Sequence, residues 1–112
     1  LPVLAAAASV EAAMGPAFST GPVGSGSWIR ESTSTLVLPK TPSNNKGDAS
    51  LWVGMGTSNG DLIQSIADAY QSSSTWSIYA YTLLSTGPTS QMPVQTDGTN
   101  AVAAEKITMH CK

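Results

Sequence analysis

Short runs in which apolar and polar residues alternate dominate the chain from residue 28 onward. In the run 49–56, Leu51 and Val53 fall on one face of an extended segment and Trp52 on the other. The run 106–112 alternates in the same way and is predicted to bury Ile107, Met109 and Cys111 while exposing Thr108 and His110. Polar turn clusters separate these runs. The pattern predicts an all-β domain, an antiparallel β-sandwich or part of one.

Residues 61–70 fit two structures. As a helix, they would place Ile66 and Tyr70 on one face, with Asp61 as N-cap and Gln64 completing a capping box. As a strand, they would place Gln64 and Ile66 together on one face. Periodicity slightly favours the first, so we expect a possible short helix here in an otherwise β-rich domain.

Two regions are predicted along the 112 residues, a length that allows one hydrophobic core. Residues 1–13 are Ala-rich and apolar, and 14–27 are rich in Gly and Pro, so 1–27 is predicted to be an N-terminal arm and linker. Small residues near the start are also compatible with the end of a signal segment. Residues 28–112 are predicted to form the sandwich. No apolar run is long enough to cross a membrane as a helix.

The low charge content narrows the classes of partner. Charged residues make up 11% of the chain, the net charge is -2, and the five basic residues are scattered. A nucleic-acid surface needs clustered Lys and Arg, so no nucleic-acid partner is expected. A surface with few ionisable groups changes little in charge as the pH falls, which is compatible with a secreted protein in an acidic extracellular medium.

Cysteine and histidine each occur once. A single cysteine, Cys111, excludes an internal disulfide framework. It is interpreted either as a buried free thiol on a strand or as half of a disulfide to a second chain. With His110 as the only histidine, a multi-histidine metal site is excluded, and we expect neither metal nor cofactor.

Aromatic residues are the main candidates for ligand contacts. Trp52 lies beside Gly54 on a face of small residues, where its ring could stack on a peptide or a sugar, or could be covered by a loop or second sheet. Trp76 shares a face with apolar residues and is predicted to be in the core. Tyr79 and Tyr81 take the other face of that strand and could extend a binding surface.

Two motifs in this order resemble a known family. Trp-Val-Gly-Met-Gly at 52–56, followed by Leu-Ile-Gln at 62–64, is similar to the Trp-Val-Gly-Ile-Asp-Gly and Ile-Leu-Gln-Thr-Gly signatures of fungal glutamic peptidases, the eqolisins of peptidase family G1. The resemblance covers roughly residues 28–111. It implies a concanavalin-like sandwich of the jelly-roll type.

The family's chemistry is acid proteolysis by a Gln and a Glu, in which the Glu is general base to a water and the Gln amide polarises it and stabilises the oxyanion. The resemblance makes Gln64 the catalytic Gln. It places Trp52, Trp76, Tyr79 and Asp61 around the substrate.

No glutamate of this chain sits in a matching motif, and the family's catalytic Glu lies in a strand beyond Cys111. We therefore expect a glutamic-peptidase-like domain whose chemistry needs a Glu from another segment or chain. The alternative is a non-catalytic secreted module that binds glycan or peptide through Trp52 and the nearby tyrosines. A structural domain without a small-molecule site is the third possibility.

Overall fold

The computed structural model describes residues 17–43 and 46–112. The Ala-rich segment 1–13 of the predicted arm lies outside the described residues. Residues 17–31 are exposed and belong to no strand, so the part of the predicted linker that can be seen has no regular structure. The strands begin at Ser32 and end at Cys111.

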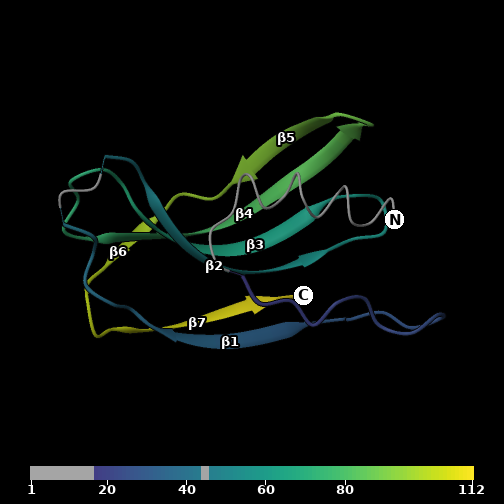
Figure 1. Cartoon of the computed structure of the whole chain (residues 1–112), viewed down its shortest axis with the longest axis horizontal. Helices are drawn as coiled ribbons and strands as arrows, with labels where there is room; N and C mark the ends of the chain where they lie inside the picture. The colour runs from purple at the N-terminus through teal and green to yellow at the C-terminus, as the bar shows by residue number, and fades with distance from the viewer. Residues whose placement is uncertain (1–16, 44–45) are drawn as a thin grey trace.

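The fold is an antiparallel β-sandwich, as predicted (Figure 1). Its strands are β1 (Ser32–Val37), β2 (Ala49–Gly56), β3 (Leu62–Ala69), β4 (Trp76–Gly87), β5 (Ser90–Gln95), β6 (Thr99–Ala101) and β7 (Lys106–Cys111). The small sheet consists of β1 and β7. The large sheet has the order β2-β3-β4-β5, and β6 also pairs with β4. Every strand pairing is antiparallel.

The prediction of a possible helix at 61–70 is wrong, because Leu62–Ala69 is the strand β3. β3 pairs with β2 along one edge and with β4 along the other, from Leu62 opposite Gly56 to Asp68 opposite Ser77. Pairing on both edges satisfies the backbone without a helix and outweighs a weak local preference. Asp61 therefore caps no helix. It lies in the tight β2–β3 turn, where Gly60 adopts a positive φ of 91°.

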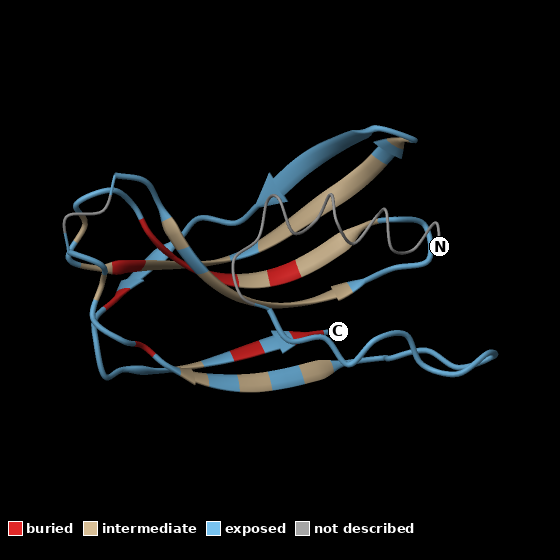
Figure 2. Ribbon diagram, in the orientation of Figure 1, coloured by how far each residue is buried: buried red, intermediate tan, exposed pale blue. Residues whose placement is uncertain are grey.

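The core lies between the two sheets and includes the residues predicted to be inside. Met109 and Cys111 of β7 are buried, while Thr108 and His110 between them are exposed. Leu51 and Val53 of β2 are half-buried against this core. The buried cluster comprises Leu38, Ala67, Ala69, Trp76, Ala101 and Met109. Figure 2 shows buried stretches on β3 and on the facing strand β7.

Trp76 anchors this core, as its face on β4 predicted. Its side chain is 2% exposed, and its indole Nε1–H donates a hydrogen bond to the carbonyl oxygen of Pro39 at 2.9 Å. Pro39 follows β1, so this bond ties the large sheet to the small one. Burying an indole N–H is costly unless it has an acceptor, which Pro39 provides.

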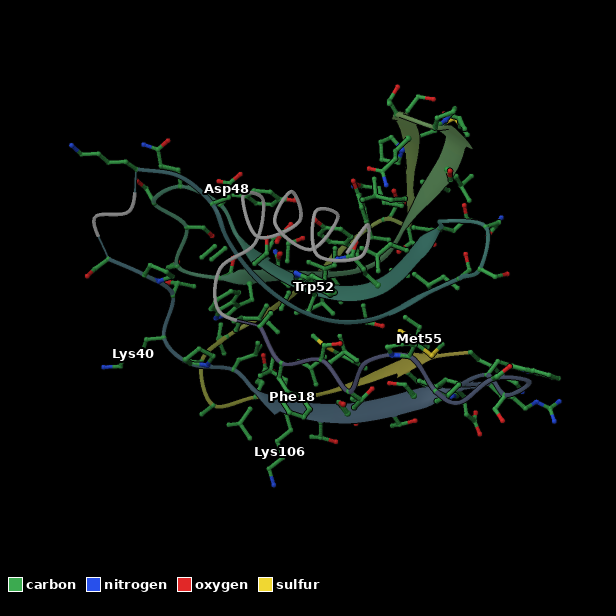
Figure 3. All side chains as sticks on the ribbon, turned by 45° about the vertical axis from the view of Figure 1, so that its right-hand side comes forward. Phe18, Lys40, Asp48, Trp52, Met55 and Lys106 are labelled. Atoms are coloured by element: carbon green, nitrogen blue, oxygen red, sulfur yellow. The ribbon has the colours of Figure 1, made fainter. Side chains whose placement is uncertain are left out.

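The large sheet is curved. The β4–β5 hairpin bends away from β1 and β7, so the large sheet is concave on the side opposite the small sheet (Figures 1 and 3). We call this side the outer face and the side that packs on β1 and β7 the inner face. Trp52 lies on the large sheet, and Lys106 lies on the other side of the sandwich (Figure 3).

Candidate functional site

Strand register gathers three of the predicted site residues on the outer face. Trp52 lies opposite Ile66, which lies opposite Tyr79 on the next strand. In the adjacent row, Gln64 lies opposite Gly54 on one side and Tyr81 on the other. Directly opposed residues of antiparallel strands point to the same face. Trp52, Gln64 and Tyr79 therefore share one surface, although they come from three strands.

Gly54 allows Trp52 and Gln64 to approach each other. A Cβ atom built on Gly54 would lie 3.1 Å from Cζ3 of Trp52 and 3.1 Å from Cγ of Gln64. It would lie only 2.6 Å from the carbonyl oxygen of Ile63. No side chain fits there, so the indole and the Gln64 side chain both pack over the bare backbone of this glycine.

Gln64 is a buried residue whose amide forms no hydrogen bond to any described residue. Its side chain is 7% exposed, and it forms no hydrogen bond within the part of the chain that the structure describes. Among the described residues, every polar side-chain atom that is shielded from solvent has a hydrogen-bond partner. Because the Gln64 amide has none, its polar atoms must contact solvent. A primary amide has two N–H donors and a carbonyl acceptor. Packing against Gly54 holds the side chain that carries these groups in place.

Asp68 is a second polar centre on the outer face. It is 7% exposed, and its carboxylate accepts hydrogen bonds from the hydroxyls of Ser50 and Tyr79. Burial raises the pKa of the Tyr79 hydroxyl above its usual value, and the bond to the Asp68 carboxylate raises it further. Tyr79 in turn contacts Tyr81 edge-to-face, with ring centroids 6.2 Å apart. Asp68 thus orients a tyrosine pair that reaches the row of Gln64.

Two other predicted site residues do not join this group. Trp76 lies on the inner face, buried in the core, where its hydrogen bond to Pro39 is structural. Asp61 holds the β2–β3 turn: its carboxylate accepts hydrogen bonds from Ser85 N–H at 2.7 Å and from the Asn59 amide at 3.1 Å. Both carboxylate oxygens of Asp61 are therefore already used by the protein.

No glutamate among the described residues lies near Gln64 on this face. Glu31 precedes β1 and pairs with exposed His110 at 3.0 Å, and Glu105 accepts a hydrogen bond from Val102 N–H. Asp68 is on the same strand face as Gln64 but four residues away, a separation of about 13 Å along a strand. One water molecule cannot bridge that distance. The described site therefore has an amide and aromatic rings but no general base beside the amide.

The sequence predictions did not include Asp68 and Ser50. The signal was present, because a strand through 62–69 places Asp68 on the same face as Gln64. A helix over the same residues would not place Asp68 and Gln64 in this relation. The link to Ser50 depends on the β2–β3 register, which pairs Ser50 with Asp68 and is not visible in local sequence.

Cys111 is buried at 3% exposure between the sheets. Its Sγ lies 3.6 Å from Oγ of Ser65 and 3.7 Å from the carbonyl oxygen of Val53. In this structure Cys111 is a buried free thiol on a strand. A disulfide to a second chain stays a prediction. The described residues contain no group of three or more His, Cys, Asp or Glu placed to hold a metal ion. They also include no helix long and apolar enough to span a membrane.

Comparison with known proteins adds no relative to this picture. No family model, no curated protein and no solved structure matches the chain. The sandwich architecture therefore follows from the strands and their pairing alone, and the resemblance to glutamic peptidases rests on the motifs at 52–56 and 62–64.

Proposed function

We propose that the outer face binds an extended peptide and that Gln64 is the group that engages the peptide backbone. The observation that carries this proposal is Gln64, a residue more than nine-tenths buried whose amide has no hydrogen-bond partner among the described residues. Because packing already fixes the Gln64 side chain, a ligand that replaces the water at its amide can form hydrogen bonds at a small cost in conformational entropy. A peptide backbone offers a complementary C=O and N–H.

The neighbours of Gln64 suit the same ligand. Trp52 and Tyr81 flank it, so the amide is bordered by aromatic rings that can pack on peptide side chains. The arrangement supports interpreting the chain as the Gln-bearing part of a glutamic-peptidase-like sandwich. In that chemistry the amide polarises the attacking water and donates to the oxyanion. The low charge content supports an acidic extracellular setting for it.

Catalysis needs a group that the described residues do not provide beside Gln64. A general base must lie within hydrogen-bond reach of the nucleophile, directly or through one water. Asp68 is too far along β3 and is already bonded to Ser50 and Tyr79. In this proposal the chain alone binds peptide, and hydrolysis at acid pH appears only when another segment or chain places a Glu opposite Gln64.

The test is peptide binding by purified protein at about pH 4, measured by fluorescence anisotropy with a labelled mixture of extended decapeptides. Gln64→Ala should weaken binding about tenfold, the loss of one or two hydrogen bonds. Gln95→Ala is the matched control, because Gln95 lies in the same row of the sheet but is exposed, and it should change the Kd less than about twofold. Equal affinity for the two variants would remove Gln64 from the site.

Hydrolysis is tested on the same material. Acid proteolysis at about pH 4 is compared for the parent, Gln64→Ala and Gln64→Glu, alone and with added Glu-containing peptides. Equal cleavage by all three proteins in every mixture would exclude Gln64 from any mechanism.

A glycan is the second candidate ligand, and the half-buried indole of Trp52 in the same row as Tyr79 favours it. Aromatic rings stack on sugar faces, and the Asp68 centre beside them is rich in hydrogen-bonding groups. Oligosaccharide binding that is lost in Trp52→Ala, together with no peptide binding by the parent, would establish this function instead. Glycan binding that survives Trp52→Ala would exclude it.

A further inference from the structure

A row of apolar residues borders Gln64 on the side of the β2–β3 turn. Leu62 lies opposite Gly56 on β2 and opposite Leu83 on β4. Leu62 and Gln64 are alternate residues of β3, so they share the outer face at a spacing of about 7 Å. Both leucines are only half-buried, so part of their apolar surface is exposed. We call Leu62 and Leu83 the leucine row.

A second apolar row borders Gln64 on the opposite side. Ile66 lies two residues further along β3, between Trp52 and Tyr79 on the neighbouring strands. Ile66 is 6% exposed, whereas the two aromatic side chains are half-buried. The hydroxyl of Tyr79 is bonded to Asp68, so its polar atom is already used by the protein. We call Trp52, Ile66 and Tyr79 the aromatic row.

The large sheet is almost free of charged side chains. Its five strands, all within the described part of the chain, contain a single charged residue, Asp68. Asp68 is 7% exposed, and its two carboxylate oxygens accept hydrogen bonds from Ser50 and Tyr79. Neither row beside Gln64 therefore offers a partner to a charged side chain. A charged group brought there would lose water without gaining an ion pair.

The spacing of the two rows matches an extended peptide. Leu62 and Ile66 are four residues apart, about 13 Å along β3. In an extended peptide, neighbouring side chains on one face are about 7 Å apart. A peptide that runs along β3 with its backbone engaged at Gln64 therefore has one sheet-facing side chain on each side of Gln64. One lies toward the leucine row and the other toward the aromatic row.

We infer that the outer face selects peptides in which the two side chains flanking the Gln64-bound peptide group are apolar and uncharged. This inference rests on the proposed function and narrows its ligand. An apolar side chain at either position buries carbon against one of the two rows, and the gain grows with the area removed from water. A carboxylate beside the aromatic row would also face the negative charge of Asp68, one row further along β3. Acidic residues are therefore disfavoured most.

The probe is a set of four labelled heptapeptides of Ser and Thr that carry a pair of identical residues at positions 3 and 5. The pair is Leu, Gln, Glu or Lys, and the peptide ends are blocked, so the four differ only in this pair. At pH 6 the Glu and Lys side chains are charged. The Leu peptide should bind at least about tenfold more tightly than the Glu and Lys peptides, with the Gln peptide between them. Equal affinities for the Leu, Glu and Lys peptides would overturn the inference.

A variant of the leucine row tests which residues set the preference. Leu83→Glu should weaken binding of the Leu peptide at least about fivefold and bring the Lys peptide to equal or higher affinity, because the new carboxylate faces the peptide side chain. Gln91→Glu is the matched control: it adds the same charge at an exposed position of β5, one row beyond the leucine row. It should keep the parent order of the four peptides. Leu83→Glu with the parent order would contradict the assignment.

The inference and the proposed function fail in different ways. Gln64→Ala should weaken binding of all four peptides by a similar factor and keep their order. If Gln64→Ala weakens binding but the parent does not distinguish Leu from Glu, the proposed function stands and the inference is refuted. If the Leu peptide is preferred but Gln64→Ala binds it as tightly as the parent does, the role of Gln64 is refuted and the apolar preference stands. No binding of any peptide at millimolar concentration would overturn both.

Discussion

Replacing Gly54 by alanine tests whether close packing over one glycine assembles the candidate site. The added methyl would lie 2.6 Å from the carbonyl oxygen of Ile63 and 3.1 Å from both Trp52 and Gln64. The two side chains can shift by rotation, but the carbonyl belongs to a strand paired on both edges. Gly56 provides the matched control: it lies two residues further on the same face of β2, and nothing lies within 4 Å of a Cβ built there.

The magnitude follows from two opposing effects. Overpacking costs about 1–3 kcal/mol, and contact with a backbone atom places Gly54→Ala in the upper half of that range. Alanine also restricts the unfolded chain, which stabilises the fold by about 0.4–1 kcal/mol at both positions. Gly54→Ala should therefore lose about 2 kcal/mol, whereas Gly56→Ala should gain about 0.5 kcal/mol. For a domain of this size the loss lowers the Tm by about 8 °C.

The assay is urea unfolding followed by tryptophan fluorescence, with Tm from circular dichroism as a second measurement. The two variants should differ by about 2.5 kcal/mol in free energy of unfolding, with similar m-values. Gly54→Ala should also alter the native emission spectrum, because the Trp52 ring must move. If Gly54→Ala were as stable as Gly56→Ala and kept the parent spectrum, the packing of Trp52 and Gln64 over Gly54 would be refuted.

Three further predictions concern the core, the Tyr79 hydroxyl and the Cys111 thiol. Trp76→Phe, which removes the hydrogen bond to Pro39, should lower the free energy of unfolding by about 1–3 kcal/mol, measured by urea titration; an unchanged midpoint would show that the bond is not needed. The pKa of Tyr79 is raised in the folded protein, so the tyrosine contributes its full stabilisation below about pH 10. At higher pH this contribution is lost, because the phenol ionises in the unfolded chain but stays protonated in the folded protein. The urea midpoint of the parent should therefore fall more steeply between pH 9 and 11 than that of Tyr79→Phe, by the effect of one titrating tyrosine. Parallel curves for the two proteins would contradict the assignment. Cys111 should react with a thiol reagent far more slowly in native protein than in urea, and an intact mass that falls on reduction would instead reveal the second chain.

Much of the architecture was predictable because it depends on local periodicity. Side chains of a strand alternate between two faces, so a sheet with one buried face requires the pattern seen at Leu51, Val53 and Met109. Trp76 was predicted to be in the core for the same reason. The proximity of Trp52 to Gln64 was suggested only by a resemblance of motifs, since nothing in local spacing places two separate strands in register.

What the sequence by itself determined is therefore the class of fold, the alternation of its strands and the buried position of Trp76. Tertiary structure decided that Leu62–Ala69 is a strand, because its partners on β4 lie outside any local window and satisfy its second edge. It also decided the polar centre on the outer face, where Asp68 meets Ser50 and Tyr79, which are 18 and 11 residues away. The local preference of a residue for helix over strand is only some tenths of a kcal/mol, which strand pairing and burial readily outweigh.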